Sequence, residues 1–327
     1  MKAMNASKGL ISFCLLSVWA HPIQGATGSD EPLVETGMTV STPWNEKPEN
    51  SDSFFLVMKK SINELSVRSF RDPNKVFKIY RAITGTNNGD KEREGDKRTP
   101  EGIYFIESQI SQGRLQALHG AAAFELNYPN PVDRIHKRTG SGIWIHGVDN
   151  ENRMQKKFDT LGCIAVSNSD ILDLAQYITG FKKIPVVVVG ESNPAQTVGF
   201  EIPGSPLYER VKAWAAAWSS REAESYLAFY HTDFRSRGMD YKGWRTYKTR
   251  LTKSYKSIDV QLQNLRVLKH GKYSVAVFDQ IYRSDRYSSS TRKRLYWIGE
   301  GAEAQILAEE VAQELPPTND PAQAAAL

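Results

Sequence analysis

The sequence has 327 residues but only two cysteines, Cys14 and Cys163, so a scaffold held by several disulfides is excluded. It also lacks a long hydrophobic run. The longest apolar stretch near the N-terminus, Gly9 to Ala20, is too short to cross a bilayer. The six histidines show no zinc-ligand spacing. We therefore expect no disulfide framework, no membrane bundle, no metal and no other cofactor.

The N-terminal segment is typical of a secretory signal peptide. Lys2 and Lys8 precede the apolar run, and the small residues Gly25 and Ala26 lie beyond it. This pattern predicts a signal peptide over residues 1–26, export to the periplasm, and no transmembrane segment after cleavage. Cleavage would remove Cys14 and leave Cys163 alone. In an oxidising compartment, a lone cysteine is either an inert buried thiol or a nucleophile.

Length and composition predict two ordinary domains. The chain is 40% hydrophobic and 24% charged, which is enough apolar material for real cores. Its net charge of +5 and pI near 9.0 favour an acidic partner, such as nucleic acid, an anionic membrane surface or the cell wall. Predicted export argues against nucleic acid. A cell-wall polymer that carries free carboxylates would fit a basic protein.

Changes in pattern along the chain predict the domain boundaries. The expected segments are a flexible leader at 27–50, a strand-rich catalytic domain at 51–190, a Pro-rich linker at 191–206, an accessory domain at 207–312 and a disordered tail at 313–327. In the accessory domain, helical spacing from Leu207 to Leu251 precedes three alternating strands, at 257–269, 272–284 and 289–298. This order predicts an α+β cone. We also expect a surface loop at 87–98.

One stretch, from Gly142 to Asp170, contains a histidine, a cysteine and two glycines that could work together. Short strands are expected at 143–145 and 163–166, with a loop at 148–161 between them. A glycine beside each reactive residue, Gly147 or Gly162, lets the backbone approach a substrate closely. The amides of Gly162 and Cys163 could then face an oxyanion. A helix capped by a serine is expected to follow.

The same stretch resembles a known catalytic motif. His146-Gly147, followed after a loop by Thr160-Leu161-Gly162-Cys163-Ile164, is similar to the motif of the YkuD-type L,D-transpeptidase family, which acts on peptidoglycan stem peptides. The resemblance covers roughly residues 53–190. It implies a mainly β, sandwich-like catalytic domain with short helices. The order of elements after residue 207 resembles NTF2-like domains.

Two positions depart from the family pattern. Most members carry His before the Gly-Cys pair and Arg two residues after the Cys, whereas this chain has Leu161 and Ala165. The chain is in this respect similar to the branch that contains cell-shape L,D-carboxypeptidases of helical and curved bacteria. That resemblance implies removal of the terminal D-alanine from tetrapeptide stems. The alternatives are an L,D-transpeptidase that cross-links or exchanges D-amino acids, hydrolysis of a lipoprotein-to-wall link, and a non-catalytic scaffold that binds peptidoglycan.

The resemblance also assigns roles to residues. Cys163 is the nucleophile and His146 is its base, with the second imidazole nitrogen held by a backbone carbonyl near Gly147. Four residues are expected to contact substrate, namely Tyr128, Asn130, Arg138 and Thr160. Turn chemistry alone would also explain Asn130 and the nearby Asp133, whereas Arg138 could hold a carboxylate in place of the missing arginine. Aromatic and basic residues of the second domain could bind glycan or peptide, or could simply form core: Trp244, Arg245, Tyr247, Lys248, Tyr273, Tyr282, Arg283, Arg286 and Tyr287.

Overall fold

A computed structural model describes residues 54–72, 75–178, 183–190 and 198–316. The predicted signal peptide and leader, the first part of the predicted linker and most of the predicted tail lie outside these residues. None of the described helices is both long and apolar enough to span a membrane.

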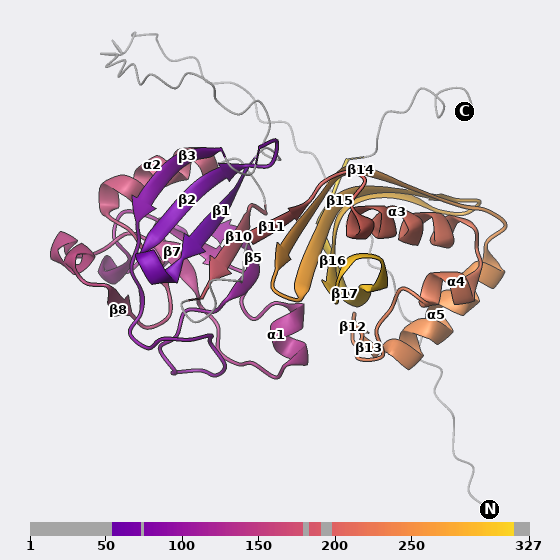
Figure 1. The fold of residues 1–327 in the computed structure, drawn as a ribbon, viewed down its shortest axis with the longest axis horizontal. Helices are drawn as coiled ribbons and strands as arrows, with labels where there is room; N and C mark the ends of the chain where they lie inside the picture. Colours follow the sequence, from indigo (N-terminus) through magenta and orange to yellow (C-terminus); the bar gives the residue numbers. More distant parts are fainter. Residues whose placement is uncertain (1–53, 73–74, 179–182, 191–197, 317–327) are drawn as a thin grey trace, which may run out of the picture. The chain divides into compact units, whose positions relative to one another are not determined.

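An eight-stranded sheet forms the first domain, with strand order β3-β2-β1-β10-β5-β6-β7-β9 (Figure 1). Its strands are β1 (Phe54–Lys59), β2 (Glu64–Ser69), β3 (Val76–Arg81), β5 (Gly102–Gln109), β6 (Ala123–Leu126), β7 (Trp144–His146), β9 (Ile164–Ala165) and β10 (Pro185–Val189). A separate short ladder pairs β4 (Thr84–Gly85) with β8 (Phe158–Thr160). The mainly β character expected for this domain is confirmed.

Both faces of this sheet are buried, which explains the unbroken apolar run of β1. Side chains of a strand alternate between faces. Phe54, Leu56 and Met58 therefore enter one core, which they share with α2 (Asn168–Ile178). Phe55 and Val57 enter another core on the opposite face. Helix α2 begins as expected, because the Ser167 hydroxyl accepts the backbone N–H of Asp170 at 3.0 Å.

The second domain is an antiparallel five-stranded sheet with the order β11-β14-β15-β16-β17. Its elements are β11 (Val198–Glu201), α3 (Pro206–Ser219), α4 (Ala223–Leu227), β12 (Arg235–Ser236), β13 (Met239–Asp240), α5 (Tyr241–Ser254), β14 (Ile258–His270), β15 (Tyr273–Ser284), β16 (Ser288–Ile298) and β17 (Gln305–Glu314). Figure 1 shows α3 lying along the sheet. Trp214 and Trp218 of α3 pack with Phe278 and Trp297 of the strands in one core. The α+β cone expected here is confirmed.

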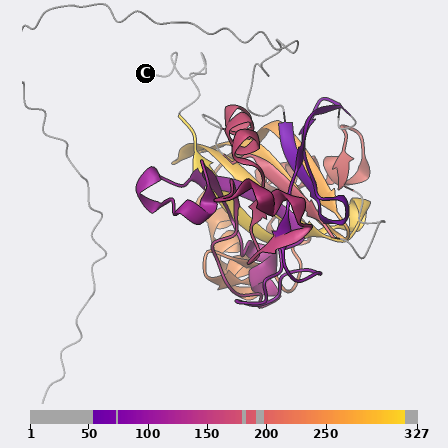
Figure 2. The ribbon, with the colours of Figure 1, turned by 90° about the vertical axis from the view of Figure 1, so that its left-hand side faces the viewer.

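The two sheets share a third core, which lies between the face of β1 that carries Phe55 and the second sheet. Phe55 and Val57 lie in one cluster with Leu268, Val275 and Tyr296. In Figure 2 the strands of the first sheet lie toward the viewer. Polar contacts surround the seam; the Arg294 guanidinium, for example, donates to the Glu107 carboxylate at 2.9 Å. The domains are therefore joined by an apolar interface.

Several expected boundaries were wrong. The second part of the predicted linker forms β11, because Phe200 packs against Phe55 with ring centroids 4.4 Å apart and pairing with β14 satisfies its backbone. A fourth long strand, β17, was missed and runs to Glu314, inside the predicted tail. The stretch 148–161 is not all loop, because it contains the 3-10 helix Glu151–Gln155 and β8. The surface loop at 87–98 contains one buried cation, Lys91.

Candidate active site

His146 lies at the end of β7 and is held in one orientation. It is 3% exposed, and its Nδ1 lies 2.5 Å from the carbonyl oxygen of Gly147. A carbonyl only accepts, so Nδ1 carries the proton and Nε2 is left with a lone pair. The expected backbone acceptor is confirmed. Burial lowers the pKa of His146 from 6.5 to about 4, so the imidazole is neutral at physiological pH.

Strand pairing places Cys163 next to β7, the strand that ends at His146. β7 and β9 run parallel, with Ile145 opposite Ile164 and His146 opposite Ala165. Continuing the register by one residue places Cys163 opposite Trp144. Since alternate residues share a face, the side chains of Cys163, Trp144 and His146 point to the same side of the sheet. Cys163 is partly exposed, which leaves a route of access to its thiol.

The surroundings of the Cys163 thiol favour its neutral form. Sγ lies 3.5 Å from the carbonyl oxygen of Gly142, which fits a thiol donor. Burial raises the pKa of Cys163, while a hydrogen bond from the backbone N–H of Trp144 and the charge of Lys91 oppose that rise. The raised pKa of the thiol and the lowered pKa of His146 favour a thiol and imidazole pair over a thiolate and imidazolium pair.

Both motif glycines are required by their surroundings. A Cβ on Gly147 would lie 2.4 Å from Oδ1 of Asn168. Gly162 has a φ of +132°, and a Cβ there would lie 2.9 Å from the carbonyl oxygen of Arg98. The backbone N–H of Gly162 donates to the Thr160 hydroxyl at 3.1 Å. The expectation that this amide faces an oxyanion is therefore corrected, because it already has a partner.

Thr160 shapes the turn before Cys163. It is 4% exposed, and its hydroxyl donates to the Cys163 carbonyl at 2.7 Å while accepting from Gly162. These bonds account for its place in the motif through the conformation of the turn. A direct contact of Thr160 with substrate stays a prediction.

The two positions that depart from the family pattern differ in their environment. Ala165 is fully buried in a small apolar cluster with Ile83, Val148 and Met154, so the strand offers no room for an arginine there. Leu161, two residues before Cys163, is 72% exposed. The region around the thiol is therefore more apolar than the family pattern implies.

The loop at 87–98 approaches the turn before Cys163 through the Arg98 carbonyl, and its Lys91 charge acts on the Cys163 thiol. The Lys91 ammonium is 2.8 Å from the Asp96 carboxylate and 5.9 Å from the centre of the Tyr128 ring. Asp96 also accepts three backbone N–H groups of the loop, and its pKa is lowered even though burial opposes that shift. Sequence reasoning missed Lys91, because nothing in a polar loop marks one lysine as buried.

Tyr128 and Asn130 have structural contacts that sequence reasoning only partly foresaw. The Tyr128 hydroxyl donates to the Thr139 carbonyl at 3.2 Å. Asn130 caps α1 (Pro131–Ile135), since Oδ1 accepts the N–H of Asp133 at 3.0 Å, and Nδ2 donates to the Ile103 carbonyl at 3.1 Å. Asn130 is 5% exposed. These bonds favour turn chemistry for Asn130, and its contact with substrate stays a prediction.

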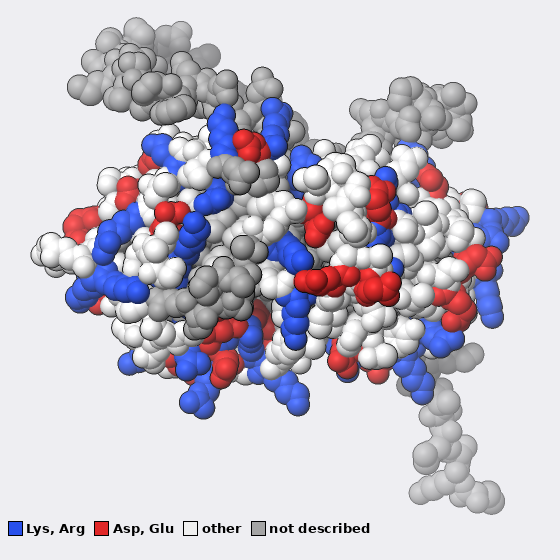
Figure 3. Space-filling view, viewed as in Figure 1, with Lys and Arg blue, Asp and Glu red and all other residues white. Residues whose placement is uncertain are grey.

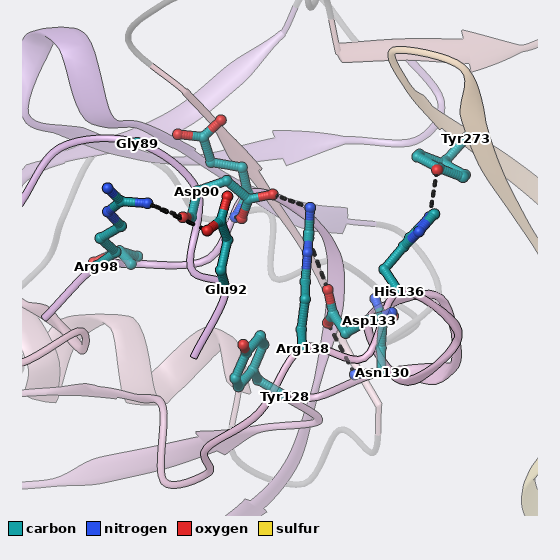
Figure 4. A network of polar contacts seen from close by, with 12 residues as sticks. Gly89, Asp90, Glu92, Arg98, Tyr128, Asn130, Asp133, His136, Arg138 and Tyr273 are labelled. Atoms are coloured by element: carbon teal, nitrogen blue, oxygen red, sulfur yellow. Dashed lines mark hydrogen bonds and ion pairs between the residues drawn. The ribbon is translucent and has the colours of Figure 1, made fainter. Parts of the chain in front are cut away.

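Arg138 lies between two carboxylates (Figure 4). Its guanidinium is 2.5 Å from Asp90 and 2.9 Å from Asp133. Burial raises the pKa of Asp90 to about 6, although Arg138 pulls it down. A guanidinium held by two acidic groups has less capacity for a third. Recognition of a substrate carboxylate by Arg138 stays a prediction. Such binding would require Arg138 to break its ion pair with Asp90 or with Asp133.

Two aromatic rings near the base were not singled out from the sequence. The ring of His119 lies 4.6 Å from Trp144 and 5.0 Å from His146, measured between centroids, and meets His146 edge-on. His119 ends the short 3-10 helix Ala117–His119, far from the motif in sequence. Only the pairing of β6 with β7 brings the end of that segment to the site, and no local pattern reveals it.

A large pocket is lined by residues of both domains, such as Asn127 of the first and Trp244 of the second, and Cys163 is not among its lining residues. Its volume is about 1210 Å³, and Trp244, Lys248 and Glu309 are among its lining residues. Lys248 is 7% exposed, and its ammonium lies 4.1 Å from the ring of Trp218 and 4.6 Å from that of Trp244. Ligand binding in this pocket stays a prediction. Positive and negative side chains are interspersed on the face in Figure 3, so the net positive charge forms no single patch there.

Comparison with known families agrees with this geometry. Residues 61–198 match the YkuD L,D-transpeptidase catalytic domain, and residues 206–310 match the Cds6 C-terminal NTF2-like domain. A putative L,D-transpeptidase of Escherichia coli K12, YafK, is 32% identical over 92 residues, which are 28% of this chain and 32% of that protein. The chain thus matches about a third of the length of this curated relative.

Two solved structures share the arrangement over both domains. Bd1075 of Bdellovibrio bacteriovorus is 29% identical, with a TM-score of 0.65 over 82% of this chain and 95% of that chain. The helical cell shape determining protein Pgp2 of Campylobacter jejuni is 24% identical, with a TM-score of 0.63 over 79% of this chain and 91% of that chain. The likeness to Pgp2 establishes a shared fold.

Proposed function

The chain carries a YkuD L,D-transpeptidase catalytic domain followed by a Cds6-type NTF2-like domain, and from this premise we propose that it is a periplasmic cysteine L,D-carboxypeptidase. It removes the terminal D-alanine from tetrapeptide stems of peptidoglycan. The observation that carries the proposal is the shared face of Cys163 and His146, with the imidazole fixed by the Gly147 carbonyl.

The reaction starts from a neutral pair. As Sγ attacks the carbonyl carbon of the third, L-centred residue, His146 Nε2 takes the thiol proton. The backbone N–H of Cys163 is the donor left for the oxyanion, since that of Gly162 bonds to Thr160. The imidazolium then gives its proton to the leaving D-alanine amine. Water attacks the thioester, the C–S bond breaks, and the tripeptide leaves.

Two features favour water over an amine as the acceptor. A buried alanine occupies the position where most family members carry arginine, so the cation that transpeptidases place near the nucleophile is missing. Pgp2, which shares both domains, is described as determining helical cell shape. We extend to this chain a role in cell shape, and the expected result is altered curvature in cells that lack the protein. Unchanged morphology would count against that extension.

The test is digestion of purified muropeptides followed by mass analysis. The wild-type protein is expected to convert tetrapeptides to tripeptides, and Cys163→Ala is expected to abolish this. Phe158→Leu, on β8 in the same domain, is a matched control that should retain activity. New dimers or exchanged D-amino acids would instead assign L,D-transpeptidase activity. No change by either protein, together with binding to peptidoglycan, would assign a scaffold.

A further inference from the structure

We propose that Lys91 is a positioning residue of the active site, which holds in place the turn that contacts the Cys163 thiol and supplies a fixed positive charge to the attacking sulfur. The inference rests on the proposed role of Cys163 as the nucleophile. Lys91 is 3% exposed, whereas the residues that follow it, 92–95, are exposed. Because burial of an ammonium group is costly, its partners must compensate for the water that it loses.

The 87–98 loop is built around this ammonium. Lys91 Nζ donates to the Asp96 carboxylate at 2.8 Å and to the Arg93 carbonyl at 3.0 Å. Asp96 also accepts three backbone N–H groups of the loop. The Lys91 and Asp96 pair therefore fixes the conformation of the loop from within.

Two hydrogen bonds join this loop to the turn that begins at Thr139. The backbone N–H of Thr139 donates to the Glu92 carbonyl at 3.1 Å. The Thr139 hydroxyl accepts the backbone N–H of Glu94 at 3.1 Å. The loop and the turn are thus held together on both sides of Thr139.

Lys91 itself packs on the same turn, just before the residue that contacts the nucleophile. Gly140 has a φ of +98°, and a Cβ there would lie 3.3 Å from Cε of Lys91. Two residues later, the Gly142 carbonyl accepts from Cys163 Sγ at 3.5 Å. The lysine stem therefore supports the turn that positions the thiol.

The charge of Lys91 acts on the same thiol. It opposes the rise in the pKa of Cys163 that burial causes. Lys91 is buried and Cys163 is only partly exposed, so solvent and salt screen this attraction less than they would screen an exposed pair. As Sγ gives its proton to His146, the negative charge that develops on sulfur meets a cation that is already in place.

The experiment measures alkylation of Cys163 by iodoacetamide at pH 7 in the full chain, followed by mass analysis of the peptide that contains Cys163. Lys91→Met is expected to lower the rate about three- to tenfold, because less of the thiol is ionised. Lys91→Arg keeps the charge and should recover most of the rate. Lys97→Met is the matched control, since it removes the same charge from an exposed position of the same loop and should change the rate less than about twofold.

A second substitution separates charge from packing. Asp96→Asn breaks the same ion pair, but it removes a negative charge and keeps an acceptor oxygen. If Lys91 acts through its charge, Asp96→Asn should leave the alkylation rate equal to or above that of the wild type. Loss of the fold would expose Cys163 and raise the rate, so an unfolded variant cannot imitate the decrease expected for Lys91→Met.

The opposite results would overturn the inference. They are a decrease with both Lys91→Met and Asp96→Asn, which would leave Lys91 a packing role alone, and a rate that Lys91→Met leaves unchanged or raises. Alkylation needs no substrate, so it tests Lys91 independently of the reaction. Failure of the wild-type protein to convert tetrapeptides would refute the proposed function and would leave the alkylation result standing.

Discussion

The resting state of the Cys163 and His146 pair can be tested by its response to pH. Burial lowers the pKa of His146 to about 4, and the same cause raises the pKa of the thiol. At pH 5 a base with a pKa near 4 is about 90% neutral, whereas a histidine with a pKa near 6.5 would be about 3% neutral. Because the neutral imidazole is the base in the proposed reaction, activity should fall only as the pH drops through about 4.

Alkylation by iodoacetamide reports the same state without substrate. A neutral thiol reacts through its rare thiolate, so the rate should rise about tenfold for each pH unit between 6 and 8. His146→Asn should leave this rate nearly unchanged, because the imidazole does not ionise the resting thiol. A rate that is flat across this range, and that His146→Asn lowers more than tenfold at pH 6, would refute the neutral pair.

Three further predictions concern stability and geometry. Gly147→Ala should cost about 1–3 kcal/mol of unfolding free energy and most of the activity, because the new methyl meets Asn168 at 2.4 Å; urea denaturation and muropeptide digestion measure these effects. Lys60→Met should destabilise by about 3–5 kcal/mol, since it leaves the Glu101 carboxylate without its buried partner at 2.9 Å, and a melting curve would detect this. Arg138→Ala should cost a similar amount, because two carboxylates lose their cation, and stability should recover toward acidic pH as they take up protons.

Controls exist for the last two changes. Lys59 is adjacent to Lys60 and has a side chain that is 39% exposed, so Lys59→Met should change stability by less than about 1 kcal/mol. Arg134, 55% exposed and paired with Glu310, is the matched control for Arg138. Equal losses from a buried cation and its exposed control would contradict the reasoning.

Features encoded by local pattern could be predicted from the sequence. Alternating residues define β14 to β16, helical spacing defines α3 and α5, and the joint His-Gly and Gly-Cys motif identifies His146 and Cys163. The serine before α2 also acts as its cap. The strands, the helices and the cap depend mainly on residues that lie close together in the sequence.

What the sequence left undetermined depends on contacts between distant segments. Lys91 looks like any lysine in a polar loop until Asp96 and Tyr128 are seen to enclose it. His119 comes to the site only because the segment before β6 packs beside β7. The hydrogen bond from the Gly162 amide to the Thr160 hydroxyl forms only in one conformation of the turn, and the motif does not reveal that conformation.

The shared seam limits how this protein can be divided. Phe55 of the first sheet and Phe200 of β11 pack in one cluster with Tyr296, and every described residue falls within a single compact unit. A catalytic fragment cut after residue 190 would leave that apolar face open to water and prone to aggregate. The second domain therefore keeps an apolar face of the first sheet away from water. Calorimetry of the intact chain should show a single unfolding transition.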